Sequence, residues 1–285
     1  MICLTLAGDW FCEIPGQSGV LHLPGTLDES GIGFPDDPEQ QWKVEEVRRI
    51  GFYQPGDPIV TRLTRKYCYE GEAKISRTVS WIVPEGTRLF AEVARARHLR
   101  LLVNGKEAPL AFPASLSTPW CFEITGLATG RDEFLFLSDN SYPGWPRDAI
   151  VFSSAASDET QTNWNGLLGT FRLRAERPVF LQDVRVYAHE NELQVEVEVN
   201  AAVPWAGSLT IHSEALTKEA VFPADVRPGI HLLRTAVPLK ENAARWDLEE
   251  GCLHTLTVSA PGLDPFETRF GLRRFAAENG CFTLN

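Results

Sequence analysis

A polar run that carries one tryptophan is the part of the chain best suited to binding a sugar. The run covers residues 158–169 and contains Gln161, Thr162, Asn163 and Trp164. Amide side chains donate and accept hydrogen bonds, as sugar hydroxyls require, and an indole face can stack on the apolar face of a pyranose. The same residues also fit an Asx turn that leads into a strand, with Trp164 buried. From the residues alone, both interpretations stay open.

Carboxylates that could form a catalytic pair occur only as sequence neighbours. Examples are Asp36-Asp37, Glu45-Glu46 and Glu249-Glu250. Neighbouring side chains on a strand point to opposite faces, whereas glycoside hydrolysis with retention needs two carboxyl groups about 5–5.5 Å apart across the scissile bond. We interpret these pairs as solvated acidic turns and assign no catalytic residue.

Histidine and cysteine do not form a recognisable metal or nucleophile site in this sequence. The six histidines and six cysteines are dispersed, without metal-ligand spacing or a Cys-x-x-Cys motif. Phosphate-loop, dinucleotide and Gly-x-Ser-x-Gly fingerprints are also missing. The sequence therefore predicts no metal and no cofactor. Widely spaced free thiols favour a reducing compartment, so we expect a cytoplasmic protein, with a removed signal peptide left open.

The charge balance argues against a nucleic-acid partner. Formal net charge is -11, and the arginines are scattered rather than clustered, whereas a phosphate backbone requires a basic patch. The N-terminus has no basic region followed by a long apolar run, so neither a signal peptide nor a membrane partner is expected.

Strands must position these residues, because alternation with a period of two dominates the sequence. In 193–199 every odd residue is apolar and every even one polar, which predicts a strand with one face in a core and the other in water. Asn104-Gly105 after an apolar run predicts a hairpin with a tight turn. Only 38–49 permits a short surface helix. The fold class is therefore all-β.

The length of 285 residues predicts about two domains. A boundary is expected near Arg177-Pro178. The second segment, about 95 residues long, has turn signals at the spacing of a seven-stranded sandwich. The first is longer and suits a jelly roll with inserted loops.

Several stretches, in order along the chain, resemble family 2 glycoside hydrolases. They are Leu-Ala-Gly-Asp-Trp at 6–10, Leu-Pro-Gly-Thr-Leu-Asp at 23–28, Thr-Gln-Thr-Asn-Trp-Asn-Gly at 160–166 and Phe-Gly-Leu-Arg at 270–273. The resemblance implies a galactose-binding-like jelly-roll sandwich over 1–177, an immunoglobulin-like β-sandwich over 178–273, and the start of a linker at 274–285. In that family the last motif leads through a short hairpin into a catalytic barrel, so we expect this chain to lack the barrel.

The resemblance also implies a role for the polar run. In the family this segment approaches the mouth of the barrel, which carries the two catalytic glutamates of a retaining β-glycosidase. Carried over to this chain, the sugar contacts are Gln161, Thr162, Asn163 and Trp164. The expected function is a non-catalytic portion that walls the substrate pocket, and the chain should be inactive alone. Removal of the barrel should leave an apolar patch near Trp164 and the C-terminal strand.

The expected partners are a carbohydrate and the missing barrel. A galactoside is the first choice of β-glycoside, ahead of glucuronide and mannoside, and a homo-oligomeric parent is left open. The alternative is a stand-alone carbohydrate-binding or adhesion module without enzymatic activity. A structural sandwich that mediates subunit contacts is a third possibility.

Overall fold

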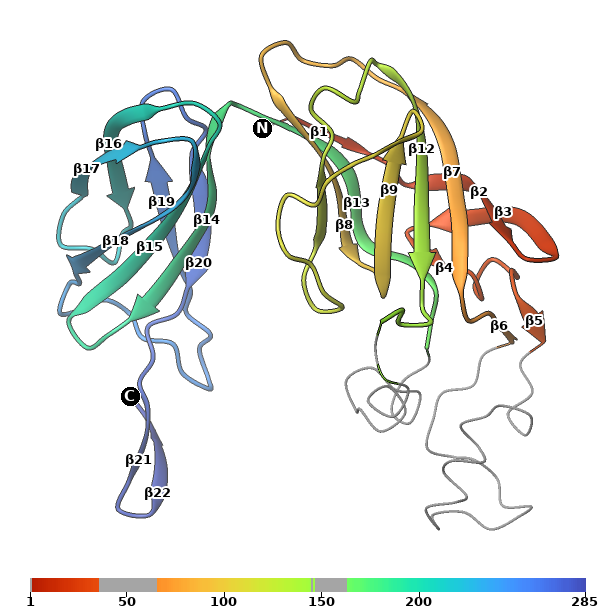
Figure 1. Ribbon diagram of the computed structural model, residues 1–285. Coiled ribbons are helices and arrows are strands. Elements are labelled where there is room, and N and C mark those ends of the chain that lie inside the picture. The colour runs from red at the N-terminus through yellow and green to blue at the C-terminus, as the bar shows by residue number, and fades with distance from the viewer. Residues whose placement is uncertain (1, 36–65, 145, 147–162) are drawn as a thin grey trace. The chain divides into compact units, whose positions relative to one another are not determined.

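The computed structural model describes residues 2–35, 66–144, 146 and 163–285, which form two compact units, Ile2–Ala175 and Glu176–Asn285. Each unit is considered by itself below (Figure 1). Among the described residues, all regular secondary structure is β-strand. The all-β prediction is therefore confirmed, while the short helix considered at 38–49 lies outside the described residues.

Two antiparallel sheets build the N-terminal unit. One has the order β1-β13-β8-β11, with β4 paired to β13, and the other has the order β10-β9-β12-β7-β2-β3. The strands of the first sheet are β1 (Ile2–Thr5), β4 (Gly25–Thr26), β8 (Arg88–Arg95), β11 (Trp120–Glu123) and β13 (Gly166–Glu176). Those of the second are β2 (Gly8–Ile14), β3 (Gln17–Leu23), β7 (Glu72–Ser80), β9 (His98–Val103), β10 (Lys106–Glu107) and β12 (Arg131–Asp139). A separate pair joins β5 (Phe34–Pro35) and β6 (Tyr67–Cys68).

Aromatic rings hold the two sheets of this unit together. Trp10 on β2 meets Phe136 on β12 edge to face, with ring centroids 5.6 Å apart, and it also contacts Phe171 on β13 at 5.2 Å. The guanidinium of Arg77 lies 4.4 Å from the Trp10 ring and donates to the carbonyl oxygen of Leu6 at 2.9 Å. Aromatic pairs of this geometry stabilise a core beyond the area that they bury.

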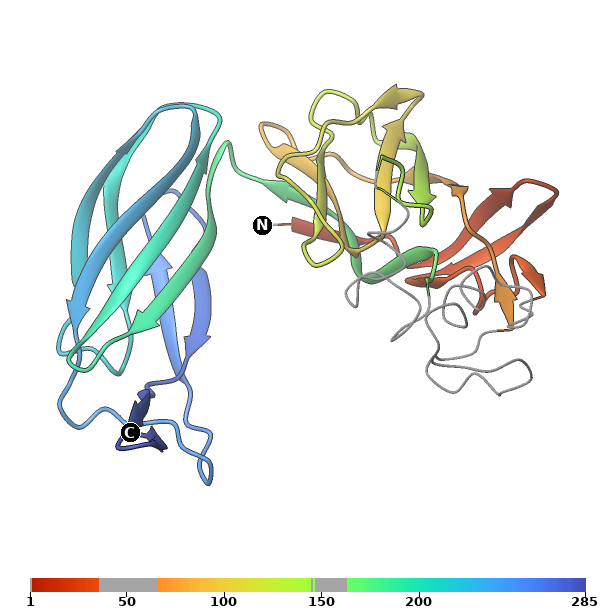
Figure 2. The same ribbon diagram turned by 60° about the horizontal axis from the view of Figure 1, so that its bottom comes forward.

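The C-terminal unit is a sandwich of seven strands. Its sheets have the orders β14-β15-β18 and β17-β16-β19-β20, and the two views in Figures 1 and 2 show them as facing layers. The strands are β14 (Val179–Ala188), β15 (Glu192–Ala201), β16 (Trp205–His212), β17 (Ala220–Val226), β18 (Gly229–Pro238), β19 (His254–Ser259) and β20 (Phe266–Phe270). The unit has a hydrophobic core of its own.

Strand β15 follows the predicted alternation on its apolar face only. Leu193, Val195 and Val197 are fully buried, as expected. The opposite face is not simply in water, because Glu196 is also buried and accepts a hydrogen bond from Arg234 at 2.7 Å. Arg185 lies 3.8 Å from the same carboxylate. Neighbouring arginine side chains thus cover a face that alternation alone assigns to solvent.

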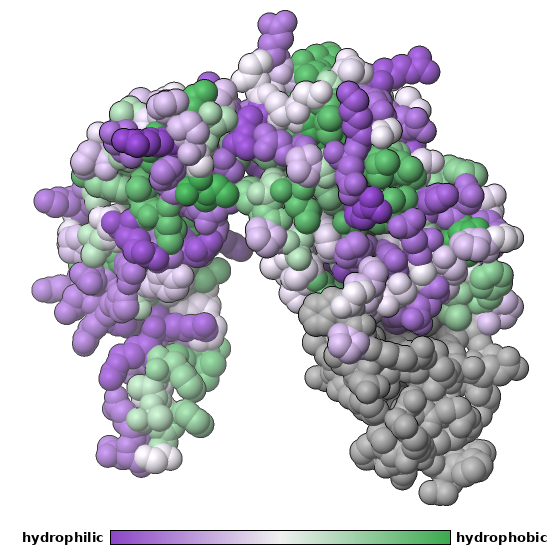
Figure 3. Space-filling view, viewed as in Figure 1, coloured by the Kyte–Doolittle hydropathy of each residue, from purple (hydrophilic) through white to green (hydrophobic). Residues whose placement is uncertain are grey.

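A short hairpin follows the sandwich, as the Phe-Gly-Leu-Arg resemblance predicts. Its strands are β21 (Phe275–Glu278) and β22 (Cys281–Leu284), joined by Asn279-Gly280 with positive φ at both residues. Phe275 and Phe282 stack with centroids 5.4 Å apart, yet they are 68% and 78% exposed. The hairpin therefore carries the apolar surface seen in green at the lower left of Figure 3.

All six cysteines are described, and none of them forms a disulfide. Burial raises the pKa of the Cys12 thiol to about 12 and that of Cys121 to about 11. These two side chains stay protonated at neutral pH and behave as small core residues. Within the described part of the chain, there is also no helix of the length and apolarity needed to cross a membrane.

Candidate functional site

A cavity of about 220 Å³ lies beside the strand that begins after the polar run. Its walls come from the loop after β3, from the segment around β6, and from the start of β13. The lining residues are Thr26, Leu27, Asp28, Glu29, Ile32, Tyr67, Cys68, Tyr69, Asn163, Trp164, Asn165 and Leu168. One indole, two phenols and two carboxylates on one small cavity form a surface suited to a polar ring compound.

Three buried asparagines fix the start of this wall. Asn140, which follows β12, donates from its amide to the carbonyl oxygens of Asn163 at 2.8 Å and Tyr69 at 2.9 Å. The amide of Asn163 donates back to the carbonyl oxygen of Asn140 at 3.0 Å. Asn165 donates to the carbonyl oxygen of Gly71 at 2.9 Å. All four bonds run from a side-chain amide to a backbone carbonyl oxygen in a buried or partly buried position, so the network holds one backbone geometry.

Trp164 lies between the two asparagines and is half-buried. All three residues, Asn163, Trp164 and Asn165, line the cavity. The guanidinium of Arg97 lies 4.6 Å from the Trp164 ring centre and donates to the hydroxyl of Tyr142 at 2.7 Å. Arg97 is buried. A cation against one face of an indole fixes the ring plane.

A tight loop supplies the acidic side of the cavity. Thr26 and Glu29 bond reciprocally: the Thr26 backbone N–H donates to the Glu29 carboxylate at 2.8 Å, and the Glu29 N–H donates to the Thr26 hydroxyl at 3.3 Å. Asp28 accepts from the backbone N–H of Tyr67 at 2.8 Å. The loop is tied to the residue just before β13 through the Leu27 N–H, which donates to the carbonyl oxygen of Asn165 at 3.0 Å.

Both carboxylates are thus engaged in holding backbone, and they retain lone pairs that can accept from a ligand hydroxyl. Tyr69 donates its own hydroxyl to the carbonyl oxygen of Glu72 at 3.0 Å. Burial, together with the charges of Asp139 and Glu72, raises the pKa of this phenol. Tyr69 therefore stays neutral. The arrangement offers stacking and hydrogen bonding, which is the chemistry of recognition.

The four residues expected to touch a sugar have separate outcomes. Gln161 and Thr162 lie outside the described residues. Asn163 is buried, and its amide belongs to the asparagine network described above. Trp164 lines the cavity. Sugar contact by these residues stays a prediction.

Sequence reasoning did not identify the other side chains of the site. Asp28 and Glu29 belong to a loop that was noted only for its resemblance, and their spacing from Thr26, Thr-x-x-Glu, is the local signal that could have identified the reciprocal bond. Arg97 and Asn140 have no such signal, because they meet the run only through the pairing of distant strands.

No family model matches this sequence, and no curated protein matches it either. Solved structures do match over the whole chain. A β-D-mannosidase from Dictyoglomus thermophilum superposes with a TM-score of 0.67 at 16% identity, covering 100% of this chain and 39% of that enzyme. A β-glucuronidase from Bacteroides uniformis gives 0.68 at 15%, covering 100% and 34%.

A family 2 β-galacturonidase from Eisenbergiella tayi gives a TM-score of 0.70 at 16% identity, covering 100% of this chain and 45% of the enzyme. At such identities the likeness establishes fold and not activity. The chain spans less than half the length of each of these three proteins. The predicted resemblance to family 2 glycoside hydrolases is therefore confirmed at the level of the fold, over the full length of this chain.

Proposed function

We propose that this chain is the non-catalytic N-terminal portion of a retaining family 2 glycoside hydrolase. In this proposal residues 1–177 form its sugar-binding jelly roll, 178–273 its immunoglobulin-like sandwich and 274–285 the start of the linker to a catalytic barrel. The observation that carries the proposal is the cavity lined by Trp164, in a fold shared over its full length with glycosidases.

The part played by the chain is to form one wall of the substrate pocket. Trp164 presents an indole whose plane is fixed by Arg97, and Asp28 and Glu29 accept from sugar hydroxyls. The bond-breaking groups, two glutamates by resemblance, belong to the barrel. The exposed Phe275–Phe282 pair supports the same proposal, since apolar surface of this kind is covered in a finished assembly. A β-galactoside remains the first substrate to try.

The proposal predicts weak binding of a sugar by the chain alone. A single wall buries little of a monosaccharide, so calorimetric titration with galactose should give no dissociation constant tighter than about 1 mM. A micromolar constant would instead support the stand-alone carbohydrate-binding module. The DNA sequence after codon 285 provides an independent test. The proposal requires that the reading frame continues there and encodes a barrel.

The role of Trp164 is tested in the polypeptide that includes the barrel. Trp164→Ala should raise the KM for a β-galactoside about tenfold and change kcat little, because stacking on the ring acts on the bound sugar. Phe11→Ala removes an aromatic that is 51% exposed elsewhere in the N-terminal unit and serves as the control. Equal KM values for the two variants would contradict a role for Trp164 in the wall of the substrate pocket.

A further inference from the structure

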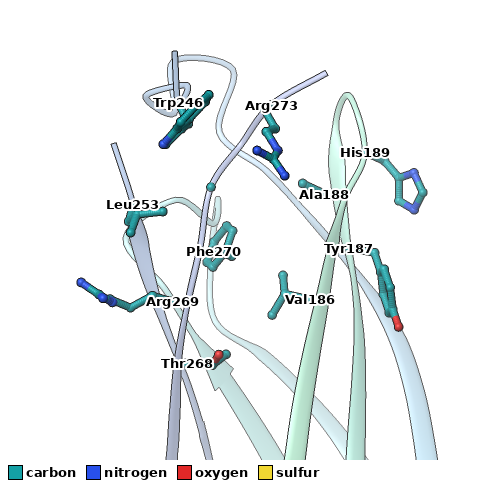
Figure 4. Close-up of a pocket in the computed structure, with 11 residues that line it drawn as sticks. Val186, Tyr187, Ala188, His189, Trp246, Leu253, Thr268, Arg269, Phe270 and Arg273 are labelled. Atoms are coloured by element: carbon teal, nitrogen blue, oxygen red, sulfur yellow. The ribbon is translucent and has the colours of Figure 1, made fainter. Parts of the chain in front are cut away.

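A second cavity, of about 640 Å³, opens in the C-terminal unit between the ends of β14 and β20. It belongs wholly to that unit and has no part in the site around Trp164. Figure 4 shows its lining: the β14 end supplies Val186 to His189, the β20 end supplies Thr268 to Gly271, and Trp246, Leu253 and Arg273 complete the wall.

Apolar groups form the floor of this cavity. Phe270 is buried in the core of the sandwich, and Val186 and Ala188 are partly buried against the same core. Leu253 and the Trp246 ring extend this surface towards the opening. A ligand that enters would therefore place a flat apolar body against these side chains, which favours a ring.

The charge around the cavity has one sign. Its eleven lining residues include Arg269, Arg273 and His189 but no aspartate or glutamate, in a chain whose net charge is -11. Among the described residues, no carboxylate lies within ion-pair distance of Arg273. Its guanidinium carbon lies 5.5 Å from the centre of the Trp246 ring. Neighbouring Arg274, by contrast, pairs with Glu278 at 2.9 Å.

Arg273 is also the arginine directed towards the cavity. In Figure 4 its guanidinium lies beside Trp246 and on the Phe270 side of the chain, whereas Arg269 extends away from the other side chains. A guanidinium presents a planar fork of N–H donors that matches a carboxylate. The contact with the Trp246 ring orients the guanidinium before a ligand binds.

Trp246 is itself held firmly in place. Its backbone N–H donates to the carbonyl oxygen of Leu272 at 2.9 Å, and its carbonyl oxygen accepts from the Asn285 amide at 2.9 Å. A side chain at Gly271 would come within 3.3 Å of the Trp246 Cβ, so glycine at this position permits the close approach. The Trp246–Arg273 pair is a preformed unit, and preformed groups lose little entropy on binding.

We propose that this cavity binds a small organic acid that consists of an apolar ring and a carboxylate. The ring lies on Phe270 and Val186, and the carboxylate accepts hydrogen bonds from Arg273. A saccharide fits less well, because only two of the eleven lining residues, Thr268 and Tyr187, offer a hydroxyl. This inference does not depend on the proposed function.

The test uses the whole chain and two probes of nearly the same shape, indole-3-acetate and indole-3-acetamide. In calorimetric titrations the acid should bind at least about tenfold more tightly than the amide, because only the acid forms a charge-assisted bond with Arg273. Arg273→Gln should remove that difference. Arg245→Gln, which removes an equal charge from an exposed position one residue from Trp246, should preserve it.

Three outcomes would overturn the proposal. They are equal affinities for acid and amide, an unchanged preference in Arg273→Gln, and an absence of binding heat up to about 5 mM of acid. Tighter binding of glucuronate than of indole-3-acetate would also reject the apolar-ring class, since it would mean that hydroxyl contacts dominate. The comparison of the two probes on the unaltered chain needs no variant to fold.

Discussion

At Asp132, on β12, five hydrogen bonds converge on a carboxylate that solvent does not reach. One oxygen accepts from the Asn104 amide and from the backbone and hydroxyl of Thr129, and the other accepts from the Trp81 indole and the Gly130 N–H. Burial alone would raise the pKa of this group. The hydrogen bonds from Asn104, Trp81 and Thr129 together outweigh burial and lower the pKa to about 2.

Because its folded pKa lies below the ordinary value, the Asp132 carboxylate contributes stability above about pH 4 and loses it as pH falls towards 2. Asp132→Asn should lower the free energy of unfolding at pH 7 by about 2 kcal/mol, since an amide NH₂ then faces donors. The deficit should shrink below pH 4. Urea unfolding across this pH range measures it.

Glu133→Gln is the control for this experiment, because Glu133 is the next residue on β12 but has an exposed side chain. Its free energy of unfolding should stay within about 0.5 kcal/mol of the unaltered chain at every pH. A deficit in Asp132→Asn that keeps the same size down to pH 2 would contradict the assigned charge state.

Residue roles in the polar run could be predicted only in part from the sequence. The run was identified as important, and its amides and indole were assigned to one kind of contact. In the structure, Asn163 is hydrogen-bonded to Asn140 across 23 positions of sequence, and Arg97 reaches Trp164 from the connection between β8 and β9. Local pattern carries no information on such long-range partners.

At the scale of elements, the short contact between β4 and β13 fixes where the candidate site begins. Gly166 pairs with Thr26 and has a φ of +135°, which side-chain-bearing residues rarely adopt. A Cβ at this position would lie 2.4 Å from the carbonyl oxygen of Gly25. Glycine is therefore required here both by conformation and by space.

Gly166→Ala should lower the free energy of unfolding of the N-terminal unit by more than about 3 kcal/mol, because strain in φ adds to a backbone clash. Gly86→Ala separates the two causes. Gly86 also has a positive φ, +67°, but an added Cβ there meets nothing within 4 Å. We expect Gly86→Ala to cost only about 1 kcal/mol in the same denaturation measurement. Equal losses of unfolding free energy in the two variants would mean that the backbone near Gly166 shifts to accept the added Cβ at little cost.

Elements were easier to predict than residues, for a physical reason. The alternation at 193–199 corresponds to β15, and Asn104-Gly105 has the positive φ at both residues that a tight hairpin turn demands. These signals are local. The cover over Glu196 was missed because it comes from Arg185 and Arg234 on strands on either side. Which side chains lie beside a strand depends on the order of strands in the sheet, and the sequence of the strand itself does not contain that order.

For the molecule as a whole, the two hydrophobic cores are separate clusters, one in each unit. We expect unfolding in urea to show two transitions. Ile75→Ala, in the N-terminal core, should shift one transition, and Val197→Ala, in the C-terminal core, should shift the other, each by about 2–4 kcal/mol. A single transition that moves equally with both variants would show that the units unfold as one.

The stacked pair of Phe275 and Phe282 has a practical consequence for work with this protein. A flat, apolar hairpin surface promotes self-association, so the chain should lose solubility as its concentration rises, and this is the place where that loss begins. Replacement of Phe282 by lysine is the first modification for anyone who prepares the chain for crystallisation or calorimetry. The substitution changes neither cavity and leaves both cores intact.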